Sequence, residues 1–244
     1  MTVDVHLAFV DAFSNAIEFI FSPQPSPLEG GPEVGGLDQV ADLTWTHVRL
    51  SAAALGAGLV VALPLGLYLG HRGRGDLFAV AAGNAGRALP ELVLIALFVA
   101  FIGTGFLNAT IALAILAIPP ILTNTFVGIR QVERNAVEAA RGMGMSEAQI
   151  ALRVEMPLAA PTIMTGVRTG AVNVVATATI APLASVLTLG DFILSPNVYG
   201  DAGVLAGAIL VAVLAVIVEV GLAAVQWLVT PKGVKLQRAA AEVA

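Results

Sequence analysis

Long apolar runs alternate with short polar segments along this chain. Three of the runs contain no Asp, Glu, Lys or Arg: residues 50–70, 92–129 and 169–190. A bilayer core roughly 30 Å thick is crossed by about 20 helical residues. Residues 92–129 are too many for one crossing, so we expect the chain to turn back at Gly103-Thr104-Gly105. The pattern predicts a protein that crosses a membrane several times.

Five membrane-spanning helices are predicted, with ends uncertain by several residues, near 48–70, 77–102, 106–129, 158–188 and 203–229. Pro90 should kink the second of them because proline lacks a backbone N–H donor. Gly, Ala, Ser and Thr are abundant in all five, which allows helices to approach closely in lipid.

The N-terminal segment differs from these spans. Residues 1–21 place apolar side chains at helical spacing with acidic and amide side chains largely between them, which predicts an amphipathic helix. We expect it to lie in the membrane interface rather than to span. The predicted domains are 1–44, an amphipathic helix followed by an extracytoplasmic Pro/Gly linker; 45–230, the transmembrane domain; and 231–244, a C-terminal tail.

Basic residues predict the orientation of the chain. Nine of the twelve Lys and Arg residues follow the first span, separate the third and fourth, or follow the fifth: Arg72, Arg74, Arg130, Arg134, Arg141, Arg153, Lys232, Lys235 and Arg238. An odd number of spans places all three groups on one side. The positive-inside rule makes that side, and the C-terminus, cytoplasmic.

Composition supports the same class. Hydrophobic residues make up 57% of the chain and charged residues 12%, about half the charged fraction of a soluble domain. There is no cysteine, so disulfides and thiolate metal sites are excluded, and no metal site is expected. A basic stripe for nucleic acid is also lacking. The predicted fold class is an all-α, polytopic membrane protein.

A polar insert of about 28 residues, 130–157, interrupts the apolar pattern between the third and fourth spans. Good helix formers over 132–141 predict a first short helix, and Gly142-Met143-Gly144 should end it. Ser146 followed by Gln149 matches a capping box and predicts that a second helix begins at Glu147. Pro157 is expected to open the next span, where its missing N–H has no cost.

The insert resembles the EAA motif of ABC-importer permeases. Glu138-Ala139-Ala140, then Gly144, then Val154-x-Met156-Pro157 follow that motif, with Val in place of Ile and Met in place of Leu. The resemblance implies that the insert docks on a separate ATP-hydrolysing subunit. The implied coupling residues are Glu138, Ala139, Ala140, Arg141, Gly142, Gly144, Met145, Ser146, Val154 and Pro157.

The resemblance extends over roughly residues 45–230. Segments such as GRALPELVLIALFVAF (86–101) and AIPPILTNTFVGIRQV (117–132) are similar to permeases of glycine betaine/carnitine/choline importers. The stretch SVLTL (185–189) departs from them, where many members are glycine-rich. The resemblance implies a type I ABC importer permease fold, in the cytoplasmic membrane of a prokaryote.

The same resemblance implies partners. They are a pair of ATP-binding subunits, an extracytoplasmic binding protein, and a second permease that is either an identical copy or a paralogue. The chain has no phosphate-binding loop, so we expect no cofactor on it, and ATP and Mg²⁺ on the partner ATPase. Activity as an enzyme is not expected.

Pathway residues are less clearly marked. Arg87 and Glu91 lie four residues apart around Pro90, and charges within a membrane face water or the helix bundle. They could form a gating pair or a structural ion pair, and Arg168 and Glu219 leave the same choice open. Asn124 and Asn173 could line the pathway or join helices.

Three alternatives remain open at the level of sequence. The same architecture could import an amino acid such as methionine. The chain could instead be an ion-coupled secondary transporter or a channel, which would not need the insert, or a membrane scaffold without transport activity.

Overall fold

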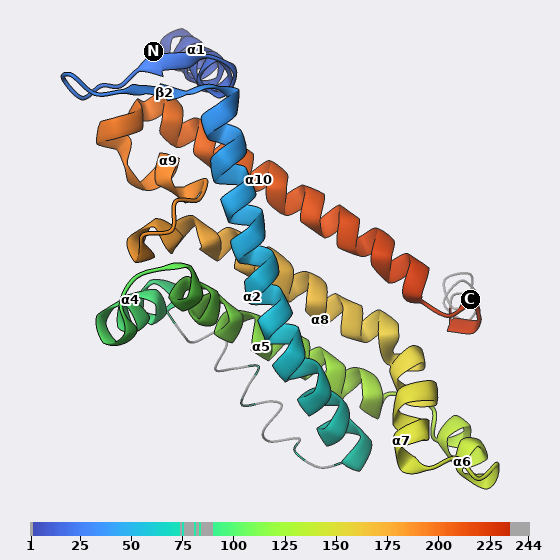
Figure 1. Cartoon of the computed structure of the whole chain (residues 1–244). Helices are drawn as coiled ribbons and strands as arrows, with labels where there is room; N and C mark the ends of the chain where they lie inside the picture. Colours follow the sequence, from blue (N-terminus) through green and yellow to red (C-terminus); the bar gives the residue numbers. More distant parts are fainter. Residues whose placement is uncertain (1, 74, 76–80, 82, 84–89, 235–244) are drawn as a thin grey trace. The chain divides into compact units, whose positions relative to one another are not determined.

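A computed structural model describes residues 2–73, 75, 81, 83 and 90–234 (Figure 1). The chain divides into two compact units. Unit 1 comprises Met1–Ala54, Pro90–Leu113 and Val174–Ile217, and unit 2 comprises Leu55–Leu89, Ala114–Asn173 and Val218–Ala244. Both are built almost entirely of helices, so the predicted all-α class is confirmed.

The elements follow one another in a simple order. In unit 1 they are α1 (Thr2–Phe21), β1 (Pro23–Pro25), β2 (Glu33–Gly35), α4 (Glu91–Ile102), the 3₁₀ helix η2 (Ala178–Ala184) and α9 (Gly190–Leu194). In unit 2 they are α6 (Arg134–Gly142), α7 (Glu147–Ile150) and the π-helical turn η1 (Ala151–Glu155). Four long helices contribute residues to both units: α2 (Gly36–Arg72), α5 (Phe106–Arg130), α8 (Met156–Thr177) and α10 (Pro196–Val229).

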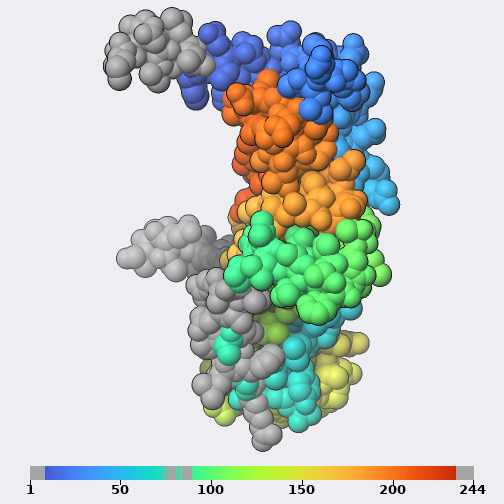
Figure 2. Space-filling view, turned by 90° about the vertical axis from the view of Figure 1, so that its left-hand side faces the viewer, coloured from blue at the N-terminus to red at the C-terminus, as the bar shows by residue number. Residues whose placement is uncertain are grey.

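An aromatic cluster holds the N-terminal helix within unit 1. Phe19 of α1 and Phe192 of α9 are buried, and their rings meet edge to face with centroids 5.3 Å apart. Tyr199 completes the cluster at 4.9 Å from Phe192. Edge-to-face pairs of this kind stabilise a core beyond the area they bury. In Figure 2 the N-terminal segment (blue) accordingly lies against the segment that contains α9 (orange).

The predicted linker is shorter than expected. Residues 22–44 were assigned to an irregular segment, but β1 and β2 pair as an antiparallel hairpin and α2 begins at Gly36. Gly35 and Gly36 both have positive φ, which glycine adopts without strain. Hydropathy indicates only the part of a helix that lies in lipid, here the predicted span 48–70. α2 begins earlier and includes residues 36–47, which carry Asp38 and Asp42.

Close helix contacts organise unit 2. A Cβ atom added at Gly58, Gly66 or Gly70 of α2 would lie 2.7–2.8 Å from side-chain carbons of α5, at Ala117, Thr125 and Ile129 respectively. Small residues at intervals of four allow backbones to approach in this way. Ile129, Ala159, Ile163 and Val167 form a buried cluster beside this contact.

Among the described residues, four segments are long and apolar enough to cross a membrane: α2, α5, the continuous helical stretch Glu147–Ala184, and α10. α4 is shorter, with 12 residues. The predicted second span, 77–102, is described continuously only from Pro90 onward, and most of the rest lies outside the described residues. Pro90 directly precedes α4, which begins at Glu91; the predicted kink depends on residues before Pro90 that lie outside the described ones, so it stays a prediction.

Two predicted ends differ from the structure. The fourth span was placed at 158–188, yet its α-helix ends at Thr177 and continues only as 3₁₀ turns to Ala184. Pro182 lies in those turns and removes one α-helical donor. The fifth is predicted at 203–229, whereas helical residues begin at Pro196. Proline is well suited to the first helical turn. Gly200, with φ +65° and ψ −178°, is not helical and separates this first turn from the long helix that follows, so the predicted start lies close to the break.

Candidate coupling site

Two short helices, α6 and α7, form the polar insert, and a glycine turn separates them. α6 ends at Gly142, and Gly144 has φ +82°, in the left-handed region that favours glycine. The N–H of Met145 donates to the carbonyl of Ala140 over 3.2 Å and closes the turn. The predicted break at residues 142–144 is confirmed, although α6 begins at Arg134 rather than 132.

The predicted capping box at the start of α7 is also present. The hydroxyl of Ser146 accepts a hydrogen bond from the backbone N–H of Gln149, and the side-chain oxygen of Gln149 accepts one from the N–H of Ser146 at 2.8 Å. Both bonds satisfy donors that a helix N-terminus leaves without partners.

The second helix of the insert continues into the membrane span without a break. α7 passes through the π turn η1 into α8, and Pro157 is the second residue of α8. Proline has no N–H for the carbonyl of Arg153, so an α-helical bond is lost at this point. The wider π turn ends directly before it, where Met156 donates to the carbonyl of Ala151. A displacement of α7 therefore reaches α8 through continuous helix.

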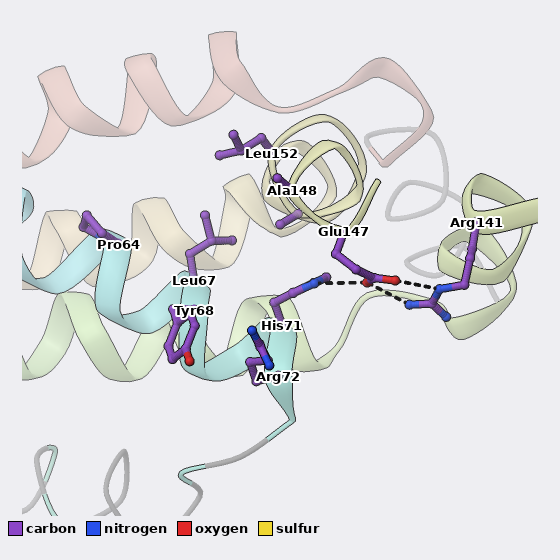
Figure 3. A pocket seen from close by; sticks show the side chains of 10 residues that line it. Pro64, Leu67, Tyr68, His71, Arg72, Arg141, Glu147, Ala148 and Leu152 are labelled. Carbon is purple, nitrogen blue, oxygen red and sulfur yellow. Dashed lines mark hydrogen bonds and ion pairs between the residues drawn. The ribbon is translucent and has the colours of Figure 1, made fainter. Parts of the chain in front are cut away.

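An ion pair joins α6 to α7 across the glycine turn. The guanidinium of Arg141 donates from Nε and Nη2 to the two carboxylate oxygens of Glu147, at 2.9 Å each (Figure 3). This hydrogen-bonded fork raises the pKa of Arg141 above its usual range. Glu138 accepts a hydrogen bond from Arg134 one turn earlier, at 3.2 Å. The first pair joins the two short helices, whereas the second lies within α6.

Small residues of the EAA motif have different surroundings. Ala140 is 2% exposed and packs inside the chain. Ala139 is exposed, and a Cβ atom at Gly142 would have no neighbour within 4 Å. Met143, at the tip of the turn, is 76% exposed. Ala139, Gly142 and Met143 are therefore exposed, and the packing of this chain does not explain why residues 139 and 142 are small.

A histidine that the sequence analysis did not single out fixes the insert to α2. His71 Nδ1 donates to Glu155 Oε2 at 2.7 Å, and His71 Nε2 lies 3.2 Å from Glu147 Oε2 (Figure 3). The side chain of Glu155 is only 8% exposed. His71 and Glu155 are 84 positions apart, and no periodicity or motif in the sequence links them. We call this contact the His71 clamp.

A groove of about 670 Å³ lies beside the clamp. Its lining comes from the end of α2 and from the insert: Pro64, Leu67, Tyr68, His71, Arg72, Arg141, Glu147, Ala148, Ala151 and Leu152. The guanidinium of Arg72 lies 5.4 Å from the centroid of the Tyr68 ring, within cation–π range. Figure 3 shows how α2 and the insert face each other across this groove.

The four predicted pathway residues belong to different parts of the chain. Arg87 lies outside the described residues, so its pairing with Glu91 stays a prediction. Glu91 belongs to unit 1, where its carboxylate accepts a hydrogen bond from the hydroxyl of Thr177 at 2.7 Å. Asn124 and Asn173 belong to unit 2 and line the same pocket of about 250 Å³.

Two charges that the sequence left ambiguous pair with each other. The guanidinium of Arg168 on α8 donates to the carboxylate of Glu219 on α10 and to the side-chain oxygen of Gln226. Gln226 in turn donates to the carbonyl of Pro161 at 2.8 Å. Within a membrane such groups are costly unless paired, and this arrangement satisfies them. The described residues contain no cluster of His, Cys, Asp or Glu suited to a metal ion.

Comparison with known proteins agrees with this architecture. The carnitine transport permease protein OpuCB of Listeria monocytogenes is 39% identical over 200 residues, covering 82% of this chain and 92% of that protein. The choline transport system permease protein OpuBB of Bacillus subtilis is 36% identical, covering 79% and 89%. An inward-facing structure of the MetNI methionine ABC transporter matches with a TM-score of 0.68 and 20% identity, over 79% of this chain and 96% of that one.

The structural likeness confirms the fold of a type I ABC importer permease. Residues 62–229, more than half of the chain, match the family described as binding-protein-dependent transport system inner membrane component. The chain is thus a multi-pass membrane protein that belongs to the family of inner membrane components of binding-protein-dependent transport systems.

Proposed function

We propose that this chain forms the translocation pathway of an ATP-driven importer for a small compatible solute of the glycine betaine, choline and carnitine class. The observation that carries the proposal is the 36–39% identity, over about four fifths of the chain, to permeases named for carnitine and choline. The methionine alternative is supported only by a likeness of 20% identity, which concerns the fold. A channel or ion-coupled transporter would not require a binding protein, which the family description names.

The insert is the proposed contact with a separate ATPase pair, which holds the ATP and Mg²⁺. Ala139, Gly142 and Met143 are exposed at its tip, and Arg141 is held beside them by Glu147. Small side chains without internal neighbours permit a partner surface to approach the backbone. Movement of the partner would act on α8 through the continuous helix from α7, and on α2 through the His71 clamp.

The proposed orientation places the insert in the cytoplasm. Among the described residues, every Lys and Arg except Arg49 belongs to unit 2, which also contains the insert. Basic residues are enriched on the cytoplasmic side of membrane proteins. An extracytoplasmic binding protein and a second permease, identical or paralogous, complete the proposed assembly.

Reconstitution in lipid vesicles tests this proposal. The permease, its ATPase and its binding protein would be assembled, and uptake of labelled glycine betaine, choline, carnitine and methionine would be measured with and without ATP. We expect ATP-dependent uptake of at least one quaternary ammonium solute and none of methionine. Uptake that continues without the ATPase, or ATP-driven uptake of methionine alone, would contradict the proposal.

A further inference from the structure

Helices α5 and α8 approach each other very closely at two glycines of unit 2. A Cβ atom at Gly166 would lie 2.6 Å from both the Cβ of Asn124 and the carbonyl oxygen of Pro120. A Cβ atom at Gly170 would lie 3.3 Å from the side chain of Ile121. This spacing of two small residues is the GxxxG arrangement that brings membrane helices together. It holds residues 116–124 of α5 beside residues 166–173 of α8.

Two consecutive prolines change the backbone chemistry of α5 at this level. Pro119 and Pro120 have no N–H, so the carbonyl groups of Ile115 and Leu116 lose the donors that an α-helix would supply. Leu116 lines the pocket that Asn124 and Asn173 share. The side-chain amide of Asn124 donates to the carbonyl of Pro120 at 2.8 Å. The helix thus presents carbonyl and amide dipoles to the pocket.

The described lining of this pocket combines apolar and polar groups and carries no ionised side chain. It consists of Gly83, Leu116, Pro119, Pro120, Thr123, Asn124, Thr169 and Asn173. Its volume of about 250 Å³ lies just below the range of about 300–1,000 Å³ that holds drug-sized ligands. A solute with few heavy atoms fits this space.

Two of the lining side chains are exposed although they lie on a membrane-spanning helix. Thr169 and Asn173 are one turn apart on α8, and both are open to the surroundings of this chain. An amide side chain finds no hydrogen-bonding partner in hydrocarbon, so its transfer from water into lipid costs free energy. These side chains therefore favour contact with water or a polar solute over contact with lipid.

We propose that this pocket is a transit site for a quaternary ammonium or zwitterionic solute, an inference that rests on the proposed function. A trimethylammonium group has no N–H, so it is stabilised by oxygen dipoles such as backbone carbonyls, side-chain amides and hydroxyls. The amide hydrogens of Asn173 suit a carboxylate at the other end of a zwitterion. A site without a fixed charge holds such a solute weakly, and weak sites allow passage.

The absence of cysteine from the chain makes a labelling experiment possible. Asn173→Cys in the assembled importer would be treated with a methanethiosulfonate reagent bearing a trimethylammonium group, and with a neutral reagent of similar size. The thiolate attacks the sulfenyl sulfur, a disulfide forms and methanesulfinate leaves. Val220→Cys is the control, since Val220 is an exposed apolar residue of unit 2 on α10 and does not line the pocket.

We expect the cationic reagent to react at Asn173→Cys at least threefold faster than the neutral one, and choline or glycine betaine to slow this reaction at least threefold. Neither effect is expected at Val220→Cys. Equal rates with both reagents and no protection would overturn the transit site. Labelling of the isolated permease but not of the importer would show that a second subunit covers this surface, which would also overturn it.

A matched pair of threonines supplies a test by transport. Thr165 and Thr169 are both exposed on α8, and each hydroxyl donates to the carbonyl four residues earlier, at 3.1 and 3.0 Å. The Thr165 hydroxyl also accepts a long hydrogen bond from Gln226, at 3.4 Å. Only Thr169 lines the pocket. We expect Thr169→Ala to lower solute uptake several-fold with unchanged assembly, and Thr165→Ala to change it less than twofold. Equal effects would overturn the proposal.

Failure of the transit site and failure of the proposed function give different results. If the wild-type importer takes up a quaternary ammonium solute but the Thr169 and Asn173 variants behave as their controls do, only the transit site is wrong. If the wild type takes up no such solute although Asn173→Cys reacts selectively with the cationic reagent, the pocket accepts the cationic group, but the proposed function, and with it the role in transit, is wrong.

Discussion

Removing the His71 clamp should open the end of the insert that adjoins α8, the π turn η1. In wild type, Nδ1 of His71 donates to Glu155 at 2.7 Å, and the carboxylate of Glu155 is almost fully buried. His71→Ala leaves that carboxylate without its partner. Leaving a buried acceptor without its hydrogen-bond donor costs up to about 3 kcal/mol. The clamp joins α2 to η1, so this loss should appear as local opening of η1 rather than only as global unfolding.

Hydrogen exchange of the amides of residues 151–155 measures this opening directly. A loss of about 3 kcal/mol corresponds to an increase in exchange of roughly a hundredfold. Arg134→Ala is the control, because it also removes a hydrogen-bond donor from a carboxylate of the insert, but the side chain of Arg134 is 90% exposed. An exposed pair of this kind contributes about 0.2–1 kcal/mol, so exchange should change less than about tenfold.

The transport readout separates a positioning role from a purely structural one. If the clamp transmits movement of the insert to α2, His71→Ala should lower the number of solutes carried per ATP hydrolysed while the ATPase still binds. Similar protection of η1 in both variants, or an unchanged ratio of transport to hydrolysis with η1 opened, would refute this reasoning.

Three further predictions concern the insert and the paired charges. Gly144→Ala should destabilise the glycine turn by about 1–2 kcal/mol, because φ +82° is costly for alanine. Gly142→Ala should not destabilise it, since a Cβ atom at Gly142 would meet nothing within 4 Å. Chemical unfolding in detergent compares the stabilities of the two variants. Ser146→Ala should cost about 0.5–2 kcal/mol by removing the capping box, seen as faster exchange of the Gln149 amide, and an unchanged rate would show that the cap is dispensable. Arg168→Ala should destabilise the protein more than the double variant Arg168→Gln with Glu219→Gln, because only the former leaves an unpaired carboxylate on α10. Thermal unfolding of the two single glutamine variants and of the double variant tests the coupling. If the stability loss of the double variant equals the sum of the two single losses, the residues are not coupled.

Much of the local structure was predictable from short stretches of sequence. The break at residues 142–144 and the capping box of Ser146 and Gln149 depend on side chains within one or two helical turns, so their signals are local. The apolar runs located the membrane-spanning helices for the same reason. The helix ends were less predictable. α2 starts at Gly36 and α10 at Pro196, because hydropathy reports the surroundings of a helix and not its full length.

The candidate sites were predictable only in part. Asn124 and Asn173 could be chosen as polar residues in apolar segments, but their common pocket depends on the close approach of α5 and α8 at Gly166 and Gly170. Ala140 matched the motif, yet its side chain is buried within the chain, unlike that of Ala139. A motif gives the spacing of residues, while burial depends on what packs against them.

By itself, the sequence determined that this chain lies in a membrane as several helices, and that a helix–turn–helix insert interrupts them, because hydrophobicity, glycine turns and caps act over neighbouring residues. Only the tertiary structure decided that His71 holds Glu155 and Glu147, and that Arg168 pairs with Glu219. Such contacts join residues 51 to 84 positions apart. They form only when packed helices bring these side chains within hydrogen-bonding distance.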